Sequence, residues 1–134
     1  MKEKKSRHLD YQPVFNRQGK SLYVLDSDEI HIYSMAGEPV AFVDKEAVFN
    51  FSGKHLGWFE DGWLRDMDGK CVGFVESAGG GGPSKPKKKS QQPEPGPRKD
   101  PPPHPEDLDR PGKPIKISAW SEKSATALLE GQKK

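Results

Sequence analysis

Short runs of apolar, β-forming residues alternate with polar turn residues through the first half of the chain, and the pattern recurs four times. Each copy has one glycine at the same place, and these are Gly19, Gly37, Gly53 and Gly69. The spacings between them are 18, 16 and 16 residues. A repeat at a fixed period indicates copies of one supersecondary unit, so its columns carry the prediction of the fold.

Polar residues before each glycine predict a tight turn. Three residues before it stand Asn16, Ser34, Asn50 and Asp66. Such side chains start type I turns by accepting hydrogen bonds from backbone N–H groups further along the chain. A glycine three residues later accepts the left-handed conformation that closes a hairpin with a bulge. Each unit is therefore predicted to contain a β-hairpin.

Apolar columns flank every turn. Five residues before the glycine stand Val14, Ile32, Val48 and Leu64. At positions three, five and six after it stand Leu22, Val40, Leu56 and Val72, then Val24, Phe42, Trp58 and Phe74, then Leu25, Val43, Phe59 and Val75. These columns predict eight short strands in four hairpins, an all-β domain with a pseudo-fourfold axis. Positions three and five are expected on one face of the strand, and positions four and six on the other.

Two further columns depart from ordinary strand composition. Position four after the glycine holds Tyr23, Ala41, Gly57 and Gly73, and its three small residues predict a close approach near the axis, with ordinary strand variability as the alternative. Position seven holds Asp26, Asp44, Glu60 and Glu76. This acidic column predicts a solvated rim where acids open the next turn, and its alternatives are a cation site or a docking ring for a basic segment.

The repeat resembles a known family. The segments Tyr-Ser-x-x-Gly-Glu-Pro-Val-Ala and His-Leu-Gly-Trp-Phe-Glu-Asp-Gly, within residues 32–76, are similar to the bacterial four-fold β flower domain. The resemblance spans about residues 11–78, and Trp120-Ser121 resembles the tails of such proteins. It implies four β units around a pseudo-fourfold axis and no established activity, hence no catalytic residues. A weaker resemblance, to the PRC-barrel binding module, rests on the segment that begins at Asp66.

Composition divides the chain into four regions. Residues 1–13 are a basic N-terminal arm, and residues 14–76 are the repeat domain, with units at about 14–31, 32–47, 48–63 and 64–76. Residues 77–114 hold 11 of the 13 prolines and a run of four glycines, which predicts a disordered or partly polyproline II linker. Residues 115–134 regain an apolar pattern. A repeat domain of 63 residues is marginally stable alone, so ring closure, a dimer interface or the tail is expected to support it.

The C-terminal region predicts a docking segment. Ile115 and Ile117 alternate with polar residues as in a short strand, and Ser121 is expected to cap a helix over about 122–130. Trp120 before the cap and Ala125 within the helix match a hydrophobic staple. Such a short helix needs a surface to pack on, and Trp120, Leu128 and Leu129 are the predicted docking side chains.

Charge is distributed unevenly along the chain. Residues 14–76 carry 6 basic and 11 acidic side chains, whereas residues 77–134 carry 12 basic and 7 acidic ones. The basic tail can therefore attract the acidic domain. No long apolar run predicts a membrane span or a secretion signal, and the single Cys71 suits a reducing compartment, so a cytoplasmic location is expected.

The sequence contains no motif for catalysis, for a metal or for a cofactor. His55 and Cys71 share the column two residues after the glycine, but Ser21 and Pro39 stand there as well, which favours an undemanding surface position.

These patterns favour a non-catalytic binding or scaffolding module. Its predicted recognition surface is Trp58, Phe59 and Trp63, and its predicted partner is its own C-terminal segment, another protein or a second copy. One alternative is non-specific nucleic-acid binding through the basic cluster Lys85, Lys87, Lys88 and Lys89. The other alternative is a metal-dependent activity at the acidic column.

Overall fold

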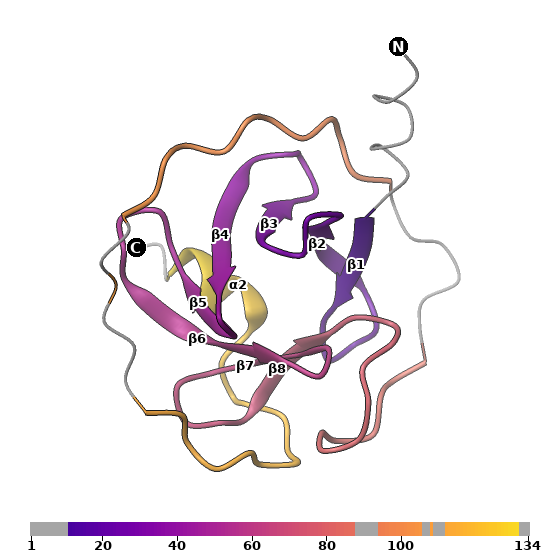
Figure 1. The fold of residues 1–134 in the computed structure, drawn as a ribbon. Helices are drawn as coiled ribbons and strands as arrows, with labels where there is room; N and C mark the ends of the chain where they lie inside the picture. Colours follow the sequence, from indigo (N-terminus) through magenta and orange to yellow (C-terminus); the bar gives the residue numbers. More distant parts are fainter. Residues whose placement is uncertain (1–10, 88–93, 106–107, 109–111, 132–134) are drawn as a thin grey trace.

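Among the residues that the computed structural model describes, eight strands and one helix make up the regular structure (Figure 1). The model describes residues 11–87, 94–105, 108 and 112–131. The elements are β1 (Tyr11–Phe15), β2 (Ser21–Asp26), β3 (His31–Ser34), β4 (Pro39–Asp44), β5 (Ala47–Phe49), β6 (His55–Glu60), β7 (Trp63–Arg65), β8 (Cys71–Phe74) and α2 (Ala125–Glu130).

The eight strands form a closed antiparallel barrel in which every strand pairs with its sequence neighbours. Strand β8 returns to β1 through the pair Phe15 and Phe74, which closes the ring. Closure leaves no sheet edge without a partner strand, so it supports a repeat domain of this small size. The predicted all-β fold of four hairpins around an axis is confirmed, although β1 begins at Tyr11, three residues before the predicted boundary.

The four glycine turns share the same backbone hydrogen bonds. In the first, the Gly19 N–H donates to the Asn16 carbonyl at 2.9 Å, and the Asn16 side-chain oxygen accepts from the Gln18 and Lys20 N–H groups at 2.9 and 3.0 Å. The four glycines have φ values between 81° and 97°, in the left-handed region that favours glycine. This is the turn that the repeat predicts.

Each hairpin also carries a β-bulge, which corrects the predicted faces. The strand register shifts by one residue beside Leu22, and it shifts beside Val40, Leu56 and Val72 in the other units. These position-three residues therefore pack with the interior cluster instead of sharing the face of position five. A bulge breaks the two-residue period of a strand, so alternation alone assigned them to the wrong face.

The barrel interior is built from two columns of the repeat, one five residues before the glycine and the other four residues after it. The two columns face each other across each hairpin, in the pairs Val14 with Tyr23, Ile32 with Ala41, Val48 with Gly57, and Leu64 with Gly73. A Cβ on Gly57 would lie under 3.0 Å from the Arg65 carbonyl oxygen and 3.4 Å from Leu128. The small residues thus allow close approach, as predicted, and one element that approaches is α2.

Helix α2 closes the end of the barrel where the glycine turns lie, and we call it the plug. Its Ala125, Leu128 and Leu129 are buried in the interior cluster. The one large residue of column four is Tyr23, whose hydroxyl donates a hydrogen bond to the Glu130 carboxylate and accepts one from the Thr126 hydroxyl at 3.2 Å. The departure of the first unit from the small-residue pattern is therefore a contact with the plug.

The plug begins later than predicted. Its N-cap is Ser124, whose side chain accepts from the Ala127 N–H at 3.0 Å. Ser121, the predicted cap, is buried and donates to the Asp66 carboxylate instead. Trp120 does not form a staple with Ala125, because its ring packs on Trp63 and Phe74 with centroids 6.0 and 6.2 Å away.

The residues that precede the plug also depart from the prediction. No strand forms at residues 115–117. The pairing lies further on, as a parallel bridge between Cys71 and Trp120. There the Cys71 N–H donates to the Ala119 carbonyl at 2.9 Å, and the Ser121 N–H donates to the Cys71 carbonyl at 2.8 Å. The segment therefore pairs with the first residue of β8 beside the fourth turn, beyond the single pair through which β1 and β8 close the barrel.

The proline-rich region runs around the outside of the barrel (Figure 1, salmon to orange). We call its described residues 77–87, 94–105, 108 and 112–119 the belt. The belt contains no helix or strand, and it contacts the glycine turns through backbone hydrogen bonds. The Gly96 N–H donates to the Met35 carbonyl at 2.7 Å, and the Lys99 N–H donates to the Gly37 carbonyl at 3.0 Å.

Three of the turn glycines let the belt approach closely. A Cβ on Gly37 would lie under 3.0 Å from the Pro97 carbonyl, and one on Gly69 equally close to the Ile115 carbonyl. At Gly53 a Cβ would lie 3.1 Å from the Pro105 ring. Because prolines have little freedom in the unfolded chain, ordering such a belt costs less entropy than ordering a glycine–serine linker.

Candidate functional site

The acidic column lies on the outer wall of the barrel. Successive residues of a strand point to opposite faces, so position seven faces outward with position five, whereas position six faces inward. Asp26 is 1% exposed, and its carboxylate lies 3.1 Å from Nε of belt residue Arg98. The Arg98 guanidinium also stacks over the Tyr11 ring, 5.1 Å from its centroid. The column therefore does not converge on the axis. At Asp26 it binds the chain's own basic segment.

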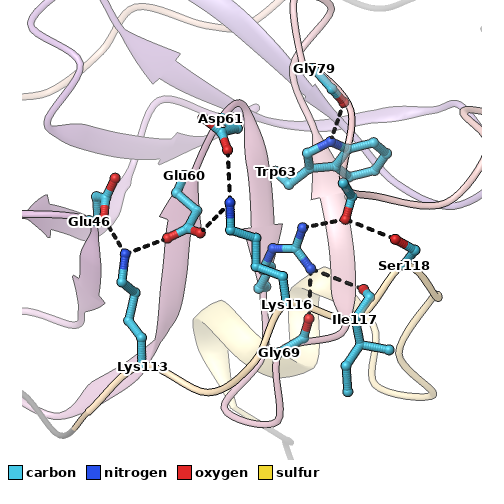
Figure 2. Close-up of polar contacts among 12 residues, drawn as sticks. Glu46, Glu60, Asp61, Trp63, Gly69, Gly79, Lys113, Lys116, Ile117 and Ser118 are labelled. Atoms are coloured by element: carbon cyan, nitrogen blue, oxygen red, sulfur yellow. Dashed lines mark hydrogen bonds and ion pairs between the residues drawn. The ribbon is translucent and has the colours of Figure 1, made fainter.

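A second part of the column holds the end of the belt. The Lys113 ammonium lies 2.6 Å from Glu46 and 2.8 Å from Glu60, and the Lys116 ammonium lies 3.2 Å from Glu60 and 3.1 Å from Asp61 (Figure 2). Burial by itself raises the pKa of Glu60, but the hydrogen bonds from the two lysines outweigh burial and hold this pKa below its ordinary value. Among the described residues, no group of three or more His, Cys, Asp or Glu side chains is arranged to hold a metal ion.

Arg65 joins three separate segments of the chain next to these ion pairs. Its buried guanidinium donates to the carbonyls of Gly69 at 2.7 Å, Ile117 at 3.0 Å and Gly81 at 2.7 Å. A planar group with several fixed donors suits such a junction better than an ammonium would. The fourth turn and both ends of the belt are thereby held together.

Two of the three predicted recognition aromatics are buried by the chain itself. Trp63 is 1% exposed, its indole N–H donates to the Gly79 carbonyl at 2.8 Å, and Gly82 lies on its ring. Trp58 is packed with Phe42, Phe49 and Leu108 on the outer wall. Neither tryptophan forms an exposed surface. Phe59 differs, because it points toward the axis and lines an open cavity.

The remaining candidate residues have structural surroundings. Trp120, Leu128 and Leu129 lie against the barrel of the same chain. Of the basic cluster, Lys85 donates to the Ala78 carbonyl at 2.9 Å and Lys87 is exposed, while Lys88 and Lys89 lie outside the described residues.

His55 and Cys71 are more enclosed than an undemanding surface position would be. Burial raises the pKa of the Cys71 thiol and lowers the pKa of His55, which packs beside Phe49 and Trp58. Cys71 belongs to a different cluster, with Trp63 and Phe74. The structure therefore gives the two residues separate surroundings.

The open cavity, which we call the cup, lies at the end of the barrel opposite the plug. Its volume is about 310 Å³. Its floor is the complete column six, formed by Leu25, Val43, Phe59 and Val75. Its rim includes Gln12, Glu29, Glu46 and Ser77. Each repeat thus contributes one apolar floor residue, and the polar groups stand above them.

The sequence places column six on the same face of the strand as the small-residue column four, and it predicts no cavity. Glu29 and Glu46 stand in the turns between the units, outside the repeat columns. A signal was present. Glu46 and Gly62 both stand nine residues after a repeat glycine, and both have positive φ, at 73° and 84°. A glycine in one copy aligned with glutamate in another indicates a turn that tolerates a left-handed residue at a cost.

These features define a class of protein, a closed barrel of four hairpin units with the described belt residues against its wall and a C-terminal helix that plugs one end. The family model described as the 4-fold beta flower protein matches residues 12–129. The chain therefore belongs to the beta flower family. The match reaches Leu129 and so includes the belt and most of the plug, well beyond the repeats that carried the resemblance.

Comparisons with curated proteins and with solved structures found no match. In the described residues, no helix has the length and apolar character needed to cross a membrane.

Proposed function

We propose that this beta flower protein is a non-catalytic binding module and that the cup is its binding site. The observation that carries the proposal is the contrast between the two barrel ends. The plug fills one end with Leu128 and Leu129, whereas the other end keeps an open cavity with an apolar floor. A concave apolar site with a few polar groups at its edge is the usual form of a small-ligand site.

The belt and the plug support this assignment, because their contacts are with the barrel of the same chain. Its tryptophan and leucines are buried in cis, and its cations Arg98, Lys113 and Lys116 face carboxylates of the wall. Nucleic-acid binding gains less support from these contacts, since a phosphate would compete with the carboxylates for the same cations. A metal-dependent activity gains less support from an acidic column that lies on the outer wall.

A neutral probe tests the proposal. Pentan-1-ol is titrated into the isotope-labelled full chain, and the amide signals are followed by NMR. We expect saturable shifts grouped at Val43, Phe59 and Val75, with a dissociation constant on the order of 1 mM for so small a molecule. Val43→Trp fills the cup and should abolish the shifts. Ile30→Trp adds the same ring at an exposed position outside the cup lining and should leave them intact.

Shifts that are scattered over the surface, or that survive Val43→Trp in a folded protein, would remove the cup as the binding site. Retention of the native amide spectrum by both variants is the condition for that comparison.

A further inference from the structure

We propose that the cup selects an organic cation, a primary ammonium or guanidinium group on a short aliphatic stem. The inference rests on the proposed function, since it names the ligand class for the same cavity. The juxtaposition that carries it is an apolar floor below a rim of oxygen acceptors. Beside its apolar floor, the cup is lined by the acidic residues Glu29 and Glu46 and the polar residues Gln12 and Ser77, and no lysine, arginine or histidine among the described residues lines it.

The charge at the rim remains negative after the belt has docked. Around Glu46, the three carboxylates of Glu46, Glu60 and Asp61 share two ammonium groups. Glu29, also on the rim, has no cation partner within the described part of the chain. A cation that enters the cup therefore meets a net negative edge, whereas an anion is repelled.

The floor complements the stem of such a ligand. Long basic side chains bury their methylene groups against apolar surface and keep the charged end at a polar edge. The four floor residues offer that surface, and the Phe59 ring adds a face that can attract a cation. A volume of about 310 Å³ is at the small end of ligand cavities, which suits one side chain or a small amine.

The backbone supports a role for the rim glutamates. Glu29 and Glu46 have φ values of 62° and 73°, a region where residues other than glycine are uncommon. The third unit has Gly62 at the position that corresponds to Glu46, so the barrel itself does not require a carboxylate there.

Three probes with equal stems test the charge selection on the full chain. Pentylamine, pentan-1-ol and pentanoate are titrated separately, and dissociation constants are taken from the amide shifts at the cup. We expect pentylamine to bind about three- to tenfold more tightly than pentan-1-ol, and pentanoate to bind more weakly than either. The expected factor is modest because the rim carboxylates lie near solvent, which weakens their attraction for a cation. Raising the salt concentration should reduce only the advantage of the amine.

A matched pair of variants assigns the effect to the rim. Glu29→Gln with Glu46→Gln should bring pentylamine to the affinity of pentan-1-ol without changing the latter. Asp68→Asn with Glu122→Gln changes the net charge equally, at exposed positions away from the cup, and should keep the advantage of the amine. Thermal unfolding of both variants verifies that the barrel is intact.

The outcomes separate the two proposals. Equal binding of amine and alcohol at the cup would overturn charge selection and leave the binding module standing. Absence of binding by all three probes would overturn both.

The cation itself has two sources, and a further probe distinguishes them. Nα-acetyl-lysine methylamide presents the same ammonium as a protein lysine would. Binding at least as tight as that of pentylamine points to a lysine side chain of a partner, and selective binding of the free amine points to a small metabolite.

Discussion

Removal of one plug side chain tests whether the C-terminal segment is part of the folded unit. Leu128 is 5% exposed and packs in the barrel interior near Gly57. Leu128→Ala removes apolar surface from the core and leaves a cavity in a barrel whose closed sheet has little freedom to collapse. Buried leucine-to-alanine changes cost about 2–5 kcal/mol, and we expect about 3 kcal/mol here.

The expected loss is large for a domain of this size. Domains of this kind are stable by about 5–15 kcal/mol, so the change removes a substantial part of the free energy of unfolding. At roughly 4 °C per kcal/mol, the melting temperature should fall by about 12 °C. A six-residue helix has no stability of its own, so the plug can undock when its anchor is lost, and the undocking free energy sets an upper limit on the effect.

Urea unfolding of the full chain measures this change, with far-UV circular dichroism and tryptophan fluorescence as two probes. Ile115→Ala is the matched control, because it also removes an aliphatic side chain from the C-terminal region but from a residue that is 84% exposed. The control should remain within about 0.5 kcal/mol of the parent. If Leu128→Ala matched the control, the plug would not be docked in solution, and the assignment of the two barrel ends would fail.

Three other perturbations have defined outcomes. Tyr23→Phe removes the hydrogen bonds to the plug and should lower the free energy of unfolding by about 0.5–1.5 kcal/mol, measured in urea. Lys45→Asn with Glu46→Gly supplies the residues that a turn with two positive φ values favours, so it should raise stability by about 1 kcal/mol while it weakens amine binding in NMR titrations. Acidification should lower the urea midpoint in two ranges: below about pH 6.5, because the folded state disfavours protonated His55, and below about pH 4.3, because protonation of Glu60 releases the two lysines. His55→Gln should flatten the first range and Glu60→Gln the second, and a midpoint independent of pH from 7 to 3 would contradict both assignments.

The repeat predicted most of the barrel because its signals are local. The residue types at Asn16 and Gly19 determine a turn through bonds within five residues, and four copies of the same pattern make a register error improbable. The bulge beside Leu22 was not predicted, since it changes which face a residue occupies without changing the residue types around it. The inward orientation of the residues three positions after the glycine could therefore be assigned only from the structure.

The belt could not be predicted from composition, because its stability comes from contacts distant in sequence. Arg98 reaches Asp26 and Lys113 reaches Glu60, and the segments around Arg98 and Lys113 are rich in proline and charged residues. The same limitation affected Trp63, which a chain without its belt would expose. A short segment with few apolar residues can become ordered when it is tethered to a complementary surface, because the tether gives it a high effective concentration at that surface.

One belt side chain, Lys113, links the belt to the rim of the cup. Lys113 contacts Glu46 on the cup rim and Glu60 on the wall at the same time. A cation at the rim weakens the hold of Glu46 on Lys113, while Glu60 can retain that lysine on the wall. If the cup binds an organic cation as proposed, the second carboxylate would let the rim exchange one cation for another without release of the belt, so a surface that binds its own basic segment could still accept a basic ligand.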